Sequence, residues 1–127
     1  MNAATDDRII KVLIADDVPY VRQALRTMFT LIGGLEVVGE AVDGQEAVYL
    51  TKMLQPDVVV MDLEMPVLNG FEAARSIKEH YPTCRVVALT THGGEEERRK
   101  AFLAGVDAFV IKGAPMEELM TAVRSVF

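Results

Sequence analysis

Polar side chains follow four of the short apolar runs in this 127-residue sequence. The runs end in Asp16 with Asp17, in Asp62, in Thr90 and in Lys112. Three carboxylates brought together repel one another and raise at least one pKa, unless a hard cation lies among them. We therefore expect Mg²⁺ at such a cluster, because this ion accepts one or two carboxylates together with waters and phosphate oxygens.

The lysine and the threonine add a second kind of chemistry to the carboxylates. Mg²⁺ does not need Lys112, so this side chain should serve a second anion. A phosphoryl group is the species that would contact Mg²⁺, an ammonium and the Thr90 hydroxyl at once. The set pairs no Ser or Cys nucleophile with a base, so covalent chemistry would fall to a carboxylate, and aspartate can accept a phosphoryl group as an acyl phosphate.

Each of these residues also has a plainer explanation when taken alone. Asp16 and Asp17 could cap a helix that begins after them, Thr90 could be a β-branched strand residue, and Lys112 a solvated lysine. Asp62 is harder to explain in this way, because a loop containing Pro66 follows it and not a helix. The convergence of all five favours a functional site.

The elements that must position these residues follow from hydrophobic patterning. Strands are predicted at residues 9–15, 35–41, 58–61, 86–89 and 108–111. Four of these runs are nearly continuous in apolar residues, as strands buried on both faces of a parallel sheet require. The run at 35–41 is more mixed, so we expect it at an edge of the sheet.

Helical patterns lie between the predicted strands. An apolar stripe runs from Val21 to Ile32, and glycines end it; Asp43 and Asn69 each precede a Glu by three residues, which is typical of a helix N-terminus. Two more helices are predicted at residues 95–104 and from about Pro115, with the proline at the first helical position. This alternation predicts an α/β fold with helices on both faces of a parallel sheet, whose ligands bind at the carboxyl ends of the strands.

Composition limits the classes of protein that remain. The chain has 19 acidic and 13 basic residues, a net charge of -6 and one cysteine, Cys84. This charge argues against a nucleic-acid or anionic-membrane surface as the main role, and one cysteine cannot form a disulfide within the chain. No segment resembles a signal peptide or a membrane span, so we expect a single cytoplasmic domain over residues 1–127.

Four motifs together resemble the response-regulator receiver domains of two-component signalling. They are residues 11–17 (KVLIADD), 62–70 (DLEMPVLNG), 88–91 (ALTT) and 105–112 (GVDAFVIK). The resemblance implies a doubly wound, flavodoxin-like (CheY-like) sheet of five parallel strands in the order 2-1-3-4-5. Gly113 follows Lys112 where many relatives have proline, which resembles the NarL/LuxR-type subgroup.

The resemblance also implies a role for each residue of the predicted site. Asp62 would be the phosphoacceptor and, with Asp17, a direct ligand of Mg²⁺. Asp16 would bind the metal mostly through water, and the backbone carbonyl of Glu64 would complete the protein ligands. Thr90 and Lys112 would hold phosphoryl oxygens.

A switch and its partners follow from the same resemblance. Phe109 would occupy the switch-aromatic position and follow Thr90 when the phosphoryl group draws that residue inward. A sensor histidine kinase would be the donor, and homodimerisation on phosphorylation is plausible for the subgroup. A transcriptional output domain, usually helix-turn-helix, would lie outside this chain, so DNA would be contacted only through it.

Two side chains depart from the common pattern of the family. Thr91 stands where a smaller residue is common, and Glu64 adds an acid beside the site. We expect both to modulate the lifetime of the phosphorylated form. Replacing Thr91 with alanine should change the rate of dephosphorylation, with the direction left open, and equal half-lives for the two phosphoproteins would contradict this.

Other functions fit the sequence less well. A stand-alone receiver or an adaptor that uses only the fold remains an alternative, although a purely structural role would not require all five polar residues. An aspartate-nucleophile phosphatase of the haloacid dehalogenase kind would need a DxDxT pattern, and Glu64 stands at its second aspartate. A nucleotide-binding module would need a glycine-rich phosphate loop. We therefore expect a switch and not an enzyme, with His92 outside the catalytic set and residues 95–100 forming a solvated, self-paired helix surface.

Overall fold

The structure is a computed structural model that describes residues 8–127. It contains one parallel sheet in the order β2-β1-β3-β4-β5, as predicted. Its strands are β1 (Ile10–Ala15), β2 (Leu35–Ala41), β3 (Val58–Met61), β4 (Arg85–Thr90) and β5 (Ala108–Ile111). Its helices are α1 (Pro19–Ile32), α2 (Gly44–Leu54), α3 (Gly70–His80), α4 (Glu95–Leu103) and α5 (Met116–Ser125).

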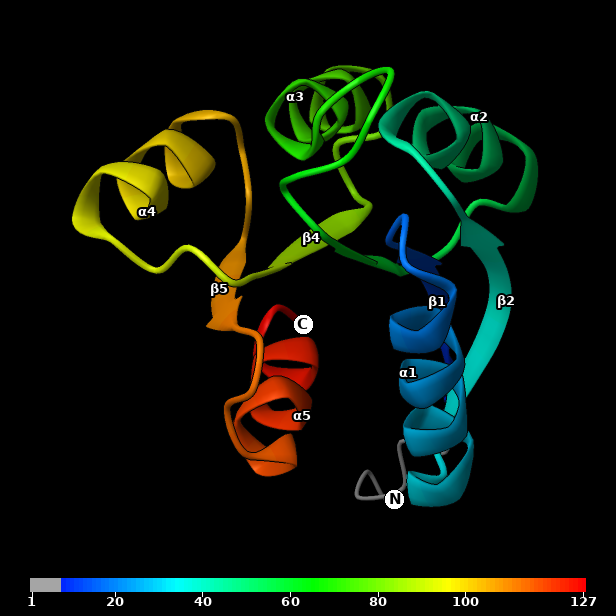
Figure 1. Cartoon of the computed structure of the whole chain (residues 1–127). Coiled ribbons are helices and arrows are strands. Elements are labelled where there is room, and N and C mark those ends of the chain that lie inside the picture. The colour runs from blue at the N-terminus through cyan, green and yellow to red at the C-terminus, as the bar shows by residue number, and fades with distance from the viewer. Residues whose placement is uncertain (1–7) are drawn as a thin grey trace.

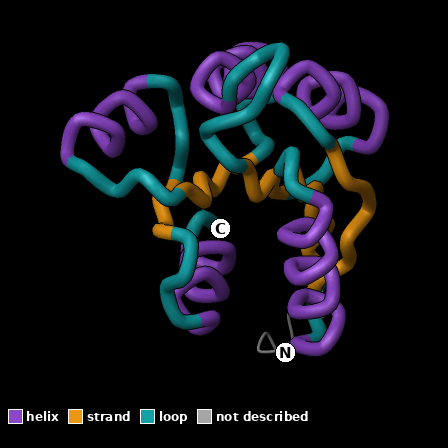
Figure 2. Tube along the Cα trace, in the orientation of Figure 1, coloured by secondary structure: helices purple, strands orange, loops and turns teal. Residues whose placement is uncertain are grey.

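Helices cover both faces of the sheet (Figures 1 and 2). The helices α2, α3 and α4 lie on one face, and α1 and α5 lie on the other. Each face therefore has its own apolar core. Leu13, Val59 and Ile77 belong to the first core, and Phe29 with Val60 belongs to the second. The alternation of strand side chains between two buried layers explains the continuous apolar runs.

The predicted edge strand is confirmed. The mixed run forms the edge strand β2, whereas all four residues of β3 are buried in the middle. Several boundaries differ from the expectation by one residue. The strand β4 extends to Thr90, which pairs with Ile111 of β5, and α5 begins at Met116, so that Pro115 is its N-cap and not its first helical residue.

Strand register brings the polar strand ends together. Ala15 of β1 pairs with Met61 of β3, and Met61 in turn pairs with Ala88 of β4. Asp16 and Asp62 are therefore neighbours one residue beyond the ends of their strands, and the amide of Asp62 donates to the carbonyl of Ala15 at 2.9 Å.

The predicted helix starts are also confirmed. The side chain of Asp43 accepts a hydrogen bond from the amide of Glu46 at 2.7 Å, and that of Asn69 accepts one from Glu72 at 3.0 Å. The side chain of Glu46 in turn accepts a hydrogen bond from the amide of Val42, one residue before the cap. The helix α1 is different, because its N-cap residue Val18 makes no side-chain cap. Proline at its first position removes one of the four amides that have no partner within the helix.

Within residues 8–127, every helix is too short or too polar to span a bilayer. Residues 1–7, on which the expectation about a signal peptide depended, lie outside the described part of the chain.

Val67 holds a strained backbone conformation in the loop after β3. Its φ is 69°, and the amide of Leu68 donates to the carbonyl of Pro66 across it at 2.8 Å, which forms a tight γ-turn. Its side chain is 75% exposed, so it gains little from packing. We expect Val67→Gly to raise the free energy of unfolding by about 1 kcal/mol, because glycine adopts this φ without strain. Urea denaturation measures the change, and equal or lower stability would contradict the prediction.

Candidate functional site

Three carboxylates lie together at the carboxyl edge of the sheet. One oxygen from each of Asp16, Asp17 and Asp62 lies within 4.8 Å of the others. Asp16 is 1% and Asp62 6% exposed, whereas Asp17 is exposed. Oxygen donors of this kind are the ligands that Mg²⁺ prefers in proteins, so the residues present fit that ion. The structure thus brings together the three acids that the sequence predicts as its ligands.

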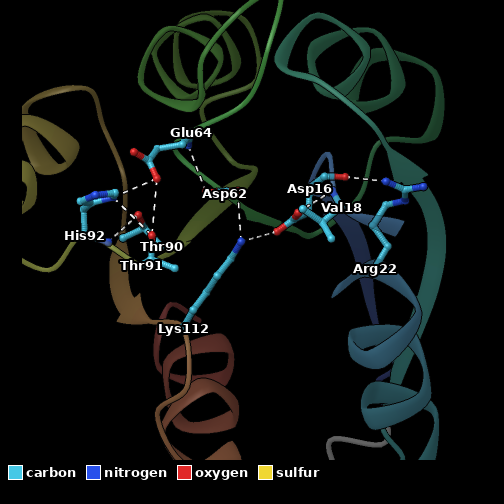
Figure 3. Close-up of polar contacts among 9 residues, drawn as sticks. All are labelled: Asp16, Val18, Arg22, Asp62, Glu64, Thr90, Thr91, His92 and Lys112. Carbon is cyan, nitrogen blue, oxygen red and sulfur yellow. Dashed lines mark hydrogen bonds and ion pairs between the residues drawn. The ribbon is translucent and has the colours of Figure 1, made fainter. Parts of the chain in front are cut away.

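Lys112 reaches this acidic cluster from the end of β5 (Figure 3). Its Nζ lies 2.8 Å from Oδ2 of Asp16 and 3.1 Å from Oδ2 of Asp62. Burial alone would lower the pKa of Lys112, but the hydrogen bonds to Asp16 and Asp62 outweigh it and raise that pKa. The ammonium is therefore held in its charged form between the two buried carboxylates.

Asp16 is held through every polar atom it has. Its amide donates to the carbonyl of Ala41 at 3.0 Å, and its carbonyl accepts from Nη1 of Arg22 at 2.7 Å. Its Oδ1 accepts from the amide of Val18 at 2.9 Å, and its Oδ2 contacts Lys112. Asp17, in contrast, has no hydrogen-bond or ion-pair partner among residues 8–127. Its carboxylate is the one left free in this cluster.

Asp62 occupies the centre of the site. Its Oδ1 accepts from the amide of Glu64 at 3.0 Å, and its Oδ2 accepts from Lys112 at 3.1 Å. Burial raises the pKa of this carboxyl above its usual range, and the Glu64 amide and Lys112 oppose that rise. A carboxylate that is shielded from water yet contacted by a cation is well suited to act as an oriented nucleophile.

Thr90 and its neighbours form the rim of the site on the side of β4. The hydroxyl of Thr90 accepts from the amide of His92 at 3.2 Å. The His92 ring lies 2.9 Å from Oε1 of Glu64, and the Thr91 hydroxyl lies 3.5 Å from the same oxygen (Figure 3). Glu64 and Thr91, which we expect to modulate the site, are thus in contact with each other.

His92, which we expect to lie outside the catalytic set, lies at the rim of the site. Its ring shares the rim with Glu64 and Thr91, although it does not contact Asp62. The position of this histidine two residues after Thr90, at the same end of β4, is the feature of the sequence that could have placed it there. The contact with Glu64 could not have been foreseen, because it depends on the path of the loop after β3.

Phe109 on β5 is mostly buried, and a cation covers its ring. It is 9% exposed and belongs to the core beneath α2, α3 and α4. The guanidinium of Arg98 lies 5.3 Å from the ring centre of Phe109 and 5.7 Å from that of Phe102. The interpretation of residues 95–100 as a solvated surface agrees with the exposure of Arg98, Arg99 and Lys100. Self-pairing holds for Arg99, which pairs with Glu96, whereas Arg98 and Lys100 contact aromatic rings, which compete with carboxylates for a cation.

Known proteins are similar to this chain in both sequence and fold. The model of the response regulator receiver domain matches residues 12–124. The chain belongs to the response regulator receiver family. The transcriptional regulatory protein DesR of Bacillus subtilis is 40% identical over 118 residues, which cover 93% of this chain and 58% of DesR.

Solved structures agree with this membership. A LuxR-family two-component response regulator from an Aurantimonas species aligns with a TM-score of 0.89 at 36% identity, covering 93% of this receiver domain and 84% of that chain. A CheX–CheY–BeF₃–Mg²⁺ complex from Borrelia burgdorferi aligns with a TM-score of 0.86 at 29% identity, covering 93% and 89%. The resemblance to the NarL/LuxR-type subgroup is thereby confirmed. The family acts as a signalling switch and not as an enzyme with an external substrate.

This receiver domain spans a little over half the length of the curated relatives that it matches, with 56% of the response regulator GacA of Pseudomonas aeruginosa and 58% of DesR covered. The further segments of those relatives have no counterpart among residues 1–127. The expectation of an output domain outside this chain therefore stays a prediction.

Proposed function

We propose that this receiver domain takes a phosphoryl group on Asp62 from the phosphohistidine of a sensor kinase. The observation that carries the proposal is the placement of one buried carboxylate, Asp62, between the Lys112 ammonium and the Glu64 amide, with the free carboxylate of Asp17 beside it. This arrangement supplies a nucleophile, a cation and a metal ligand within one small site.

The transfer itself requires little from the protein beyond position and charge. An oxygen of Asp62 attacks phosphorus as the bond from phosphorus to the donor imidazole nitrogen breaks, and the imidazole keeps that electron pair. Lys112 already contacts Oδ2 of Asp62. After the transfer, its ammonium would contact a negatively charged phosphoryl oxygen instead. The Thr90 hydroxyl, at the end of the neighbouring strand, would hold a second phosphoryl oxygen.

Asp17 and Asp62 would bind Mg²⁺ directly, and the carbonyl of Glu64 would add a third protein ligand. Asp16, whose Oδ2 contacts Lys112, would act mostly through water, as the resemblance to the family implies. Bound Mg²⁺ supplies neutralisation of the charge that develops on the transferring group. The Borrelia complex, which contains BeF₃ and Mg²⁺, supports this assignment by similarity of fold.

The phosphoryl group would act on the surface through Thr90 and Phe109. A Thr90 hydroxyl drawn toward the phosphoryl group would give up its contact with the amide of His92. Phe109, two residues along β5 from the Thr90 partner Ile111, would follow into the space beside Thr90. Phosphorylation thus shifts a two-state equilibrium on the face formed by α4, β5 and α5.

Partners and location follow from this function. The donor is a sensor histidine kinase, the domain acts in the cytoplasm, and phosphorylation favours a homodimer. The regulated output is transcription, through a DNA-binding domain outside residues 1–127, as the names of the relatives support.

Intact-mass spectrometry with acetyl phosphate and Mg²⁺ tests the proposed function. The wild type should gain one phosphoryl group, and Asp62→Asn should gain none, because an amide is a poor nucleophile. Asp57→Asn is a matched control that removes a carboxylate bonded to the amide of Lys11, at the opposite end of β1. Absence of a phosphoryl gain in the wild type, or an equal gain in Asp62→Asn, would contradict the assignment.

A further inference from the structure

Arg22 links the acidic site to two other elements. From α1, its Nη1 donates to the backbone carbonyl of Asp16 at 2.7 Å, and its Nε donates to Oε1 of Glu40 on β2 at 3.2 Å (Figure 3 shows the first contact). The side chain of Arg22 is only 15% exposed, so both contacts are shielded from water. A guanidinium can make two such bonds in fixed directions, whereas the point charge of a lysine cannot reproduce this geometry.

Glu40 is itself fixed, which makes the link rigid. Its second carboxylate oxygen accepts from Arg26, one turn further along α1. The hydrogen bond from Arg26, ahead of the opposing effect of burial and with further help from Arg22, lowers the pKa of Glu40, which stays ionised. Arg22 is therefore anchored to a charged group on the edge strand.

The Asp16 carbonyl that Arg22 holds belongs to the peptide unit that leads into Asp17. The amide, Oδ1 and Oδ2 of Asp16 are fixed by other groups, so Arg22 supplies the last contact that sets the direction of this peptide. Asp17 has no partner of its own among residues 8–127, so its carboxylate depends on the backbone for its position. Asp17, the expected metal ligand with the most conformational freedom, thus directly follows the Asp16 carbonyl that Arg22 holds.

We propose that Arg22 is a positioning residue that holds the Asp16–Asp17 turn through the Asp16 carbonyl and Glu40, so that the Asp17 carboxylate faces Asp62 across the Mg²⁺ site. The proposal rests on the proposed function, since it assigns Arg22 a role toward that metal. Two effects of Arg22 on a cation site have opposite signs. Loss of its positive charge alone would strengthen Mg²⁺ binding, whereas loss of its contact with the carbonyl would weaken it.

Mg²⁺ titrations without any phosphodonor separate these effects, with amide chemical shifts of residues beside Asp17 and Asp62 as the readout. We expect Arg22→Met to weaken Mg²⁺ binding about tenfold, as the loss of a group that orients a metal ligand does. Arg26→Met is the matched control, because it also removes one positive charge from α1 and one guanidinium partner from Glu40 but leaves the contact with the Asp16 carbonyl in place. Its affinity for Mg²⁺ should fall less than that of Arg22→Met, because Arg22 keeps its own contacts with Asp16 and Glu40 in this variant.

Each outcome of this experiment decides the proposal. Equal or tighter binding by Arg22→Met, or equal weakening in both variants, overturns it. Arg22→Lys keeps the charge but lacks the two donor nitrogens in one fixed plane that hold Asp16 and Glu40. It should therefore also bind Mg²⁺ more weakly, and it decides the question if Arg22→Met does not fold. Wild-type affinity in Arg22→Lys would overturn the proposal alone, while absence of Mg²⁺ binding by the wild type would overturn the proposed metal site as well.

Discussion

Replacing Gly70 with alanine is expected to lower the free energy of unfolding by about 3 kcal/mol. A Cβ at Gly70 would lie 2.4 Å from the carbonyl oxygen of Asp62 and 2.6 Å from the Cα of Leu63. Both contacts are with backbone, so neither can be relieved by rotation of a side chain. The start of α3 or the phosphoacceptor loop would have to move, and the amide of Gly70 would lose its 3.0 Å bond to the carbonyl of Leu63.

The displaced loop should also impair phosphorylation. A shift of the Asp62 backbone moves the nucleophile relative to Lys112, and small misplacements are costly in a reaction that depends on position. Urea unfolding measures the stability, and intact-mass spectrometry with acetyl phosphate measures the phosphorylation. Gly94→Ala is the matched control, because no atom lies within 4 Å of a Cβ built there. This control should lower the free energy of unfolding by less than about 1 kcal/mol, as a change at a helix N-cap does. An equal loss of stability in both variants would contradict the account.

Replacing Lys112 with methionine is expected to lower the free energy of unfolding by about 2 kcal/mol near neutral pH. Removing one partner of a buried ion pair costs about 3 kcal/mol or more, and the 19% exposure of the Lys112 side chain reduces this value. The variant would leave Asp16 and Asp62 buried with no cation between them. Lys112→Arg is the matched control, since it keeps the charge and should lose much less stability.

The pH dependence of this loss has a definite sign. Lys112 lowers the pKa of Asp62, which burial raises, so its removal should raise that pKa further. A carboxyl whose pKa is raised on folding contributes stability at low pH and loses it as the pH rises through the folded pKa. The difference between the wild type and Lys112→Met should therefore be smaller at about pH 5 than at about pH 7. A difference that grows on acidification would contradict the proposed arrangement of charges.

Most of the fold could be predicted from the sequence, because the local signals for helices and strands agree with the burial that the sheet requires. The polar residues of β2 indicated an edge of the sheet, and Asp43 and Asn69 marked helix starts that the structure confirms. Strand order came from the family resemblance and not from patterning. The boundary at Pro115 was less certain, because proline is favoured both at a helix cap and at the first helical position.

The site could be predicted to a similar extent. The gathering of Asp16, Asp62 and Lys112 follows from parallel strands whose carboxyl ends meet at one edge. Contacts made by long side chains could not be predicted, because they depend on loop paths and on competition between partners. The Arg98 guanidinium covers Phe109 although acidic neighbours were available on its own helix, and Arg22 binds a backbone carbonyl that no sequence pattern marks.

Reductive trapping of the phosphorylated residue tests the central claim most directly. Borohydride converts an aspartyl phosphate into homoserine, and peptide mass spectrometry then locates that residue in the chain. After treatment with acetyl phosphate and Mg²⁺, homoserine should be found at Asp62 and should be absent when Mg²⁺ is chelated. Homoserine at Asp16 or Asp17 in place of Asp62, or none in a sample that has gained a phosphoryl group, would contradict Asp62 as the acceptor.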